Sequence, residues 1–352
     1  MRKMILILSG YLLLVILAGC GGTAETSFDA KSGTVDRNHE LPFSSLRAIP
    51  AGSDGAFERF YVGEQILFLG ESHGEKRALL VRFRHALDDN RFKPAERDFG
   101  GFYFDGQGWR VLAYTRARHD STSLLAQNDY YFGSLQWNDS TRVGTLFYDR
   151  DNLTLGLEFA NLLPLQAYWE GETRLRAHAV GDATLRTLTD TVSGTVFCQL
   201  EELADYNPLA EKGSGIDKIN YDWVALLGSD NLRLLAASDS ATVDNRLYKN
   251  FLAVATDGGV LYADGSDNFR IESDLIRRDA KIFDYLALKK SATVPELGFK
   301  MDFDLSEKRF FYTSGFALAI VTGEVELDGQ ARQVWGVLEH QQRPKADPET
   351  LK

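Results

Sequence analysis

Residues 70–74 carry the clearest chemical pattern in this sequence, because they spell Gly-Glu-Ser-His-Gly. A G-x-S-x-G motif forms the sharp turn that exposes the nucleophilic serine of α/β hydrolases. That turn needs a buried strand before it, a helix after it and an oxyanion loop from an earlier strand. Ser72 lies too near the start of the chain for those earlier strands. We therefore interpret residues 72–77 as a polar turn between two antiparallel strands.

Other catalytic signatures are scarce. The six histidines show neither H-x-x-x-H nor H-E-x-x-H spacing, which leaves a histidine-based metal site without support. The sequence has no glycine-rich phosphate loop, and we expect no cofactor. Cys198 lies in an apolar segment, which favours a packing cysteine over a nucleophile.

Short runs of alternating apolar and polar residues dominate the chain. In residues 153–159, three leucines and a phenylalanine share one phase, as in a strand that is buried on one face. Asp-Gly pairs at 105–106, 257–258 and 264–265 separate such runs and are typical of hairpins. Long amphipathic helices are hard to find. The pattern predicts an all-β, antiparallel protein.

The first twenty residues are typical of a bacterial lipoprotein signal peptide. Arg2 and Lys3 precede an apolar run at 4–17, and small residues lead to Cys20. We expect cleavage before Cys20, lipidation of that cysteine and attachment to a membrane through its acyl chains. Gly21 favours the outer membrane of a Gram-negative envelope, with the leaflet left open.

Charge and composition limit the partners and the domain plan. The formal net charge of −11 argues against a nucleic-acid partner. A polar stretch follows Cys20, and a second one, with Pro, Gly and charges, interrupts the strands near residue 210. The expected segments are a signal peptide at 1–19, a tether at 20–43, a first domain at 44–202, a linker at 203–217, a second domain at 218–343 and a tail at 344–352.

Six segments match one known family in the same order along the chain. They include an opening hairpin, an alternating strand, an Asp-Trp strand and a final hairpin, and they cover residues 66–84, 153–166, 192–197, 221–226, 259–271 and 323–339. In this order they resemble the lipocalin-like AttH and hydroxyneurosporene synthase (carotenoid 1,2-hydratase) family. The resemblance implies two consecutive lipocalin-like antiparallel β-barrel or sandwich domains.

The resemblance also implies a site, with one important departure. Hydratases of this family carry an Asp-His pair where this sequence has Gln199 and Leu200, and an amide does not donate a proton to carbon. The nearest carboxylates at the implied junction of the two domains are Glu201, Glu339 and Asp222, and His340 would orient Glu339 or carry a proton. Expected ligand contacts are Trp223, Asp222, Trp335, Trp169 and Tyr168.

These residues also have purely structural interpretations. Glu201 opens a charged linker, Glu339 and His340 end a strand, and tryptophans commonly fill β cores. Three functions therefore stay open: binding of an apolar, isoprenoid- or lipid-like molecule in a cavity; a hydratase or isomerase reaction on such a molecule; and a surface lipoprotein that docks another protein. The second needs a carboxyl acid, whose pKa rises in an apolar cavity.

Overall fold

The computed structural model describes residues 61–86, 96–118, 127–130, 133–138, 141, 143–170, 174–203, 221–239, 250–264, 269–279, 284–313 and 316–341. Within these ranges the regular structure consists of strands and two short 3-10 turns, η4 (Ser229–Asn231) and η6 (Pro295–Leu297). The predicted all-β fold is confirmed. In this part of the chain, no helix has the length and apolar character needed to cross a membrane.

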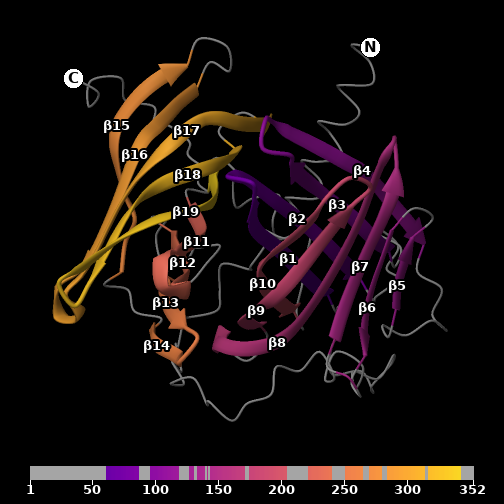
Figure 1. Cartoon of the computed structure of the whole chain (residues 1–352), viewed down its shortest axis with the longest axis horizontal. Coiled ribbons are helices and arrows are strands. Elements are labelled where there is room, and N and C mark those ends of the chain that lie inside the picture. Colours follow the sequence, from indigo (N-terminus) through magenta and orange to yellow (C-terminus); the bar gives the residue numbers. More distant parts are fainter. Residues whose placement is uncertain are drawn as a thin grey trace. The chain divides into compact units, whose positions relative to one another are not determined.

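The first domain is a ten-stranded antiparallel sheet, drawn from indigo to magenta in Figure 1. Its strands are β1 (Tyr61–Ser72), β2 (Glu75–Ala86), β3 (Glu96–Phe104), β4 (Trp109–Arg118), β5 (Gln127–Tyr130), β6 (Gly133–Asn138), β7 (Val143–Arg150), β8 (Leu153–Glu170), β9 (Arg174–Thr187) and β10 (Thr191–Leu203).

The second domain is a nine-stranded antiparallel sheet, drawn from orange to yellow in Figure 1. Its strands are β11 (Tyr221–Gly228), β12 (Arg233–Asp239), β13 (Phe251–Thr256), β14 (Gly259–Asp264), β15 (Glu272–Asp279), β16 (Asp284–Val294), β17 (Phe299–Thr313), β18 (Phe316–Leu327) and β19 (Gln330–Gln341).

Both sheets have the same winding. Each is an up-and-down meander in which the first strand pairs with the last, β1 with β10 and β11 with β19. In each domain the fourth and fifth strands follow each other in the chain but lie at opposite edges of the sheet. These strands are β4 and β5 in the first domain and β14 and β15 in the second. The chain therefore folds as two consecutive lipocalin-like domains, and its contacts divide it between β10 and β11. The signal peptide, tether and tail lie outside the described residues, and so does the predicted linker except for Leu203, which ends β10. The predicted limits therefore stay predictions.

The turn at the start of the first domain settles the role of Ser72. His73 and Gly74 have φ angles of 53° and 78°, and two successive positive φ values define a type I′ hairpin turn. Ser72 ends β1, and its Oγ donates a hydrogen bond to Oδ1 of Asp190 at 3.3 Å. A strand, not a helix, follows the turn. The predicted hairpin is confirmed and the nucleophile elbow is excluded.

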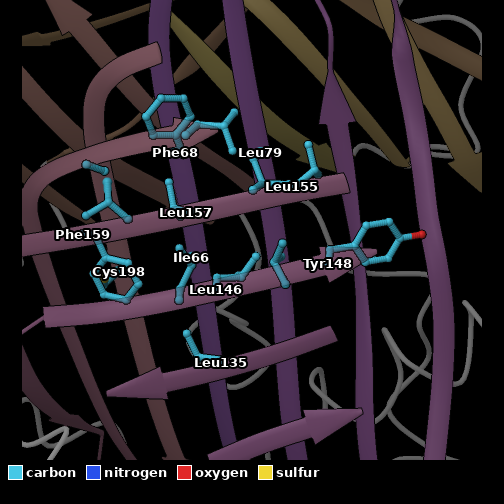
Figure 2. Packing of buried hydrophobic residues seen from close by; sticks show 14 of the residues in the cluster. Ile66, Phe68, Leu79, Leu135, Leu146, Tyr148, Leu155, Leu157, Phe159 and Cys198 are labelled. Carbon is cyan, nitrogen blue, oxygen red and sulfur yellow. The ribbon is translucent and has the colours of Figure 1, made fainter. Parts of the chain in front are cut away.

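The interior of the first domain is formed by one face of a curled sheet. Phe99 on β3 stacks on Tyr148 on β7, with ring centroids 6.0 Å apart, although five other strands lie between β3 and β7 in the sheet order. Figure 2 shows Ile66 gathered with Leu146 and Leu157 in this interior. Cys198 belongs to the same buried cluster, as expected of a packing cysteine.

The second domain has a corresponding interior. Alternate residues of its strands form one buried cluster, which includes Val224, Leu226, Leu234, Ala236, Ala292, Met301, Phe303, Val321 and Leu338. The face that carries this cluster is called the interior face below, and the opposite face is called the outer face. Successive side chains of a strand point to opposite faces of the sheet. The residues of this cluster therefore show which face each neighbouring side chain occupies.

Candidate functional site

A connected group of polar side chains lies on the interior face of the second domain. Lys290 Nζ donates hydrogen bonds to Asp222 Oδ2 and to Ser273 Oγ, each at 2.8 Å. The other carboxylate oxygen of Asp222 lies 2.7 Å from His340 Nδ1. We call Asp222, Lys290, His340 and Ser273 the interior network.

The strands bring these residues together from distant parts of the sequence. Asp222 on β11 lies directly opposite His340 on β19 in the antiparallel register. Lys290 comes from β16, and three strands stand between β16 and β11 in the sheet order. The ion pair between Lys290 and Asp222 therefore spans the interior, and curling of the sheet makes it possible.

Burial makes the interior network electrostatically significant. The Lys290 side chain has no solvent exposure, and Asp222 and His340 are 7% and 2% exposed. Burial by itself would raise the pKa of Asp222, but the charges and hydrogen bonds of Lys290 and His340 outweigh it and lower that pKa. Asp222 is therefore an anion. Because a carboxylate accepts hydrogen bonds, His340 carries its proton on Nδ1.

The lowered pKa of Asp222 predicts sensitivity to acid. A group whose folded pKa lies below its unfolded value, here 3.8, contributes its full stability above that value and loses it as the pH falls through the folded pKa. The free energy of unfolding should therefore decline more steeply below about pH 4 in the wild type than in Asp222→Asn. Urea unfolding at a series of pH values measures this. Asp304→Asn, at an exposed carboxylate, should leave the slope near that of the wild type, and equal slopes in all three proteins would contradict the prediction.

The first domain has no such network at the corresponding positions. A Cβ atom added to Gly194 would meet the Leu69 carbonyl oxygen, and one added to Gly336 would meet the Ala225 carbonyl oxygen, so the two glycines occupy equivalent places. Counting from them, Ile66 and Cys198, which are cross-strand partners, correspond to Asp222 and His340. The polar pair is therefore a feature of the second domain and not of the shared fold.

A second polar group lies on the outer face of the same two strands. Tyr221 Oη donates a short hydrogen bond to Glu339 Oε1, and Trp223 is the direct cross-strand partner of Glu339. These three side chains are 2 to 3% exposed. We call Tyr221, Trp223 and Glu339 the outer-face group.

The outer-face group contains a donor that needs an oxygen. Trp223 Nε1 is buried and has no hydrogen-bond partner among the described residues. A buried N–H group is normally satisfied by protein, by ordered water or by a ligand. The outer-face group therefore combines a carboxyl group with an indole N–H that no described residue satisfies, on adjacent strands.

The structure places the predicted site residues in two separate groups. Glu339 lies with Trp223 on the outer face, whereas Asp222 and His340 lie together on the interior face. The prediction that His340 orients Glu339 is wrong, because consecutive residues of a strand point to opposite faces. Trp335 is half-buried on β19. Glu201, Tyr168 and Trp169 have backbones in β10 and β8, but their side chains, like Cys20, lie outside the described residues.

Three site residues escaped the sequence analysis: Lys290, Ser273 and Tyr221. Lys290 follows Leu286 and Leu288 at two-residue spacing and precedes Ala292, so it lies in the apolar phase of its strand. A lysine in that phase is a recognisable signal for a buried charge. Tyr221 begins the Asp-Trp strand and carries no comparable signal.

The comparisons with known proteins bear on the fold. A crystal structure of a candidate AttH protein from Nitrosomonas europaea shares 12% identity with a TM-score of 0.61, covering 89% of this chain and 99% of that one. Kievitone hydratase from Nectria haematococca shares 11% identity with a TM-score of 0.51, covering 88% and 95%. No protein-family model matches the sequence, and no curated protein matches it. At these identities the likeness establishes a shared two-domain lipocalin-like fold.

Proposed function

We propose that this protein binds a largely apolar small molecule and adds or removes water at a carbon–carbon double bond in it, with Glu339 as the acid–base group. The observation that carries the proposal is the outer-face group, a buried carboxyl group beside a buried indole N–H that has no partner in the described chain. The fold shared with a kievitone hydratase supports the same reaction class. Membership of the AttH and hydroxyneurosporene synthase family is part of this proposal.

Each member of the outer-face group has a definite task. Hydration places a proton on one carbon of the double bond and the hydroxyl of water on the other, and dehydration reverses both steps. Glu339 exchanges the proton, Tyr221 holds the carboxyl group through its hydroxyl, and the Trp223 indole donates to the oxygen that is added or lost. Burial excludes bulk water, which limits capture of a cationic intermediate by the wrong nucleophile.

Replacing the carboxyl group tests the proposal directly. Glu339→Gln keeps the shape of the side chain but removes the exchangeable carboxyl proton, so turnover should fall by about 100- to 10,000-fold. The assay incubates the protein in water labelled with oxygen-18, with kievitone or with an extract of apolar isoprenoid alkenes, and follows label incorporation by mass spectrometry. Glu326→Gln, at an exposed carboxylate on β18, should keep wild-type activity. Turnover that Glu339→Gln leaves intact would remove Glu339 from the reaction.

Binding without turnover is the second candidate. The aromatic residues of the outer-face group, Tyr221 and Trp223, are the kind of side chains that line binding sites for apolar ligands. This candidate gains support if an apolar molecule co-purifies with the protein but no extract shows incorporation of the label. In either case we place the protein at the bacterial envelope, anchored through the lipid on Cys20 that the signal peptide implies.

A further inference from the structure

A row of polar side chains lies on the outer face of the first domain, the face opposite its interior cluster. His178, Gln199, Gln65 and Arg82 lie on the adjacent strands β9, β10, β1 and β2, and each is the direct cross-strand partner of the next. Their sequence neighbours belong to the interior cluster of the domain, so these four side chains share the outer face. We call them the polar row.

The polar row is buried and borders apolar residues. His178, Gln199 and Gln65 are 0, 6 and 8% exposed, and Arg82 is half-buried. The next row along the same four strands is apolar and fully buried, and consists of Val180, Phe197, Leu67 and Leu80. A polar group in such surroundings costs free energy unless it is hydrogen-bonded.

The hydrogen bonds within the polar row determine which donor and acceptor groups remain for a ligand. Arg82 Nε donates to Gln65 Oε1 at 2.8 Å, and a guanidinium group cannot accept, so the bonded atom of Gln65 is its oxygen. The NH₂ group of Gln65 is therefore the donor on this side of the row. On the adjacent strand, Gln199 Oε1 is buried and has no hydrogen-bond partner within the described ranges. A hydrogen-bond donor on Gln65 and an acceptor on Gln199 thus lie at directly paired positions of adjacent strands.

A hydroxyl group is the ligand group that satisfies both. Its oxygen accepts from the NH₂ group of Gln65, and its hydrogen is donated to Gln199 Oε1. An ether or ketone oxygen would leave Gln199 without a donor, and an ammonium group would bring a second positive charge beside Arg82. We propose that the polar row binds the hydroxyl group of a largely apolar alcohol or phenol. This site uses no residue of the outer-face group and stands independently of the proposed reaction.

Two probes that differ in one hydrogen-bond donor test the site. For the full-length protein, 2-naphthol should bind about tenfold more tightly than 2-methoxynaphthalene in calorimetric titrations, because the methyl ether cannot donate to Gln199. Gln199→Leu should lower the affinity for 2-naphthol about tenfold and leave that for the ether unchanged. Gln333→Leu, at an exposed glutamine on β19, is the matched control and should change neither affinity. Glu339→Gln should also leave 2-naphthol binding unchanged, which separates this site from the reaction.

A measurement on the wild type keeps the test decisive even if Gln199→Leu does not fold. In amide-labelled protein, the side-chain NH₂ resonance of Gln65 should shift on addition of 2-naphthol and stay in place with the methyl ether. Equal affinities for the two probes, no binding of either, or a Gln65 resonance that responds to neither would overturn the proposal. Those outcomes would make the polar row a site for an ordered water molecule.

Discussion

Lys290→Met should destabilise the second domain by about 3–5 kcal/mol, the usual cost of removing one partner of a buried ion pair. Methionine fills the volume of the lysine stem, but it leaves Asp222 with one cationic neighbour fewer inside an apolar cluster. Because the pair ties β16 to β11 across the interior, the loss should appear in both strands. Hydrogen exchange of the backbone amides of β11 and β16, compared with those of the first domain, measures the effect locally.

The neighbouring lysine gives a matched control. The Lys289 side chain is 59% exposed and lies 3.5 Å from Asp304, so Lys289→Met should change the stability by no more than about 0.5 kcal/mol. The double variant Lys290→Met with Asp222→Leu should recover much of the loss, since apolar residues often replace a buried ion pair at little cost. Equal effects of the two single lysine variants would show that the interior ion pair contributes nothing to stability.

Gly336→Ala should destabilise the second domain by about 4 kcal/mol or more and leave the first domain folded. A Cβ atom on Gly336 would lie 1.8 Å from the Ala225 carbonyl oxygen and within 2.9 Å of two further backbone atoms of β11. No side-chain rotation relieves a contact with backbone, so β11 and β19 would have to separate at the pair that closes the meander. Circular dichroism during thermal unfolding, with amide exchange to locate the change, measures the result.

Glycines elsewhere in the sheets provide the comparison. Gly156 on β8 has open space where its Cβ would be, so Gly156→Ala should be neutral or stabilising by up to about 1 kcal/mol through the unfolded chain. Gly194→Ala should repeat the loss in the first domain, because its Cβ would lie 2.1 Å from the Leu69 carbonyl oxygen. A Gly336→Ala protein as stable as Gly156→Ala would mean that β11 and β19 lie farther apart than described.

The two domains share a strand order but differ in the side chains at equivalent positions. Equivalent positions hold Ile66 and Cys198 in one interior and Asp222 and His340 in the other, while the strand order is the same. The fold therefore tolerates either an apolar pair or a polar pair at these equivalent positions. The proposed reaction and the proposed hydroxyl site likewise lie on the outer faces of different domains, on corresponding central strands.

Many features of the fold could be predicted because they depend on neighbouring residues. Two-residue alternation identifies the strand at 153–159, since one face of a strand is buried and the other is not. His73 and Gly74 identify a hairpin, because both accept a positive φ. The same alternation, applied strictly, would have separated Glu339 from His340 and marked Lys290 as a buried charge.

The residues of the candidate site come together through contacts between distant parts of the sequence, and no local pattern predicts such contacts. Tyr221 and Glu339 are 118 residues apart, as are Asp222 and His340, and they meet because β11 pairs with β19 in one register out of many. Lys290 reaches Asp222 only after the sheet curls across three further strands. Alternation is a property of each strand and can be read from its residues, whereas register and curvature follow from the packing of all the strands together, which is why the tertiary structure was needed to show which polar groups meet.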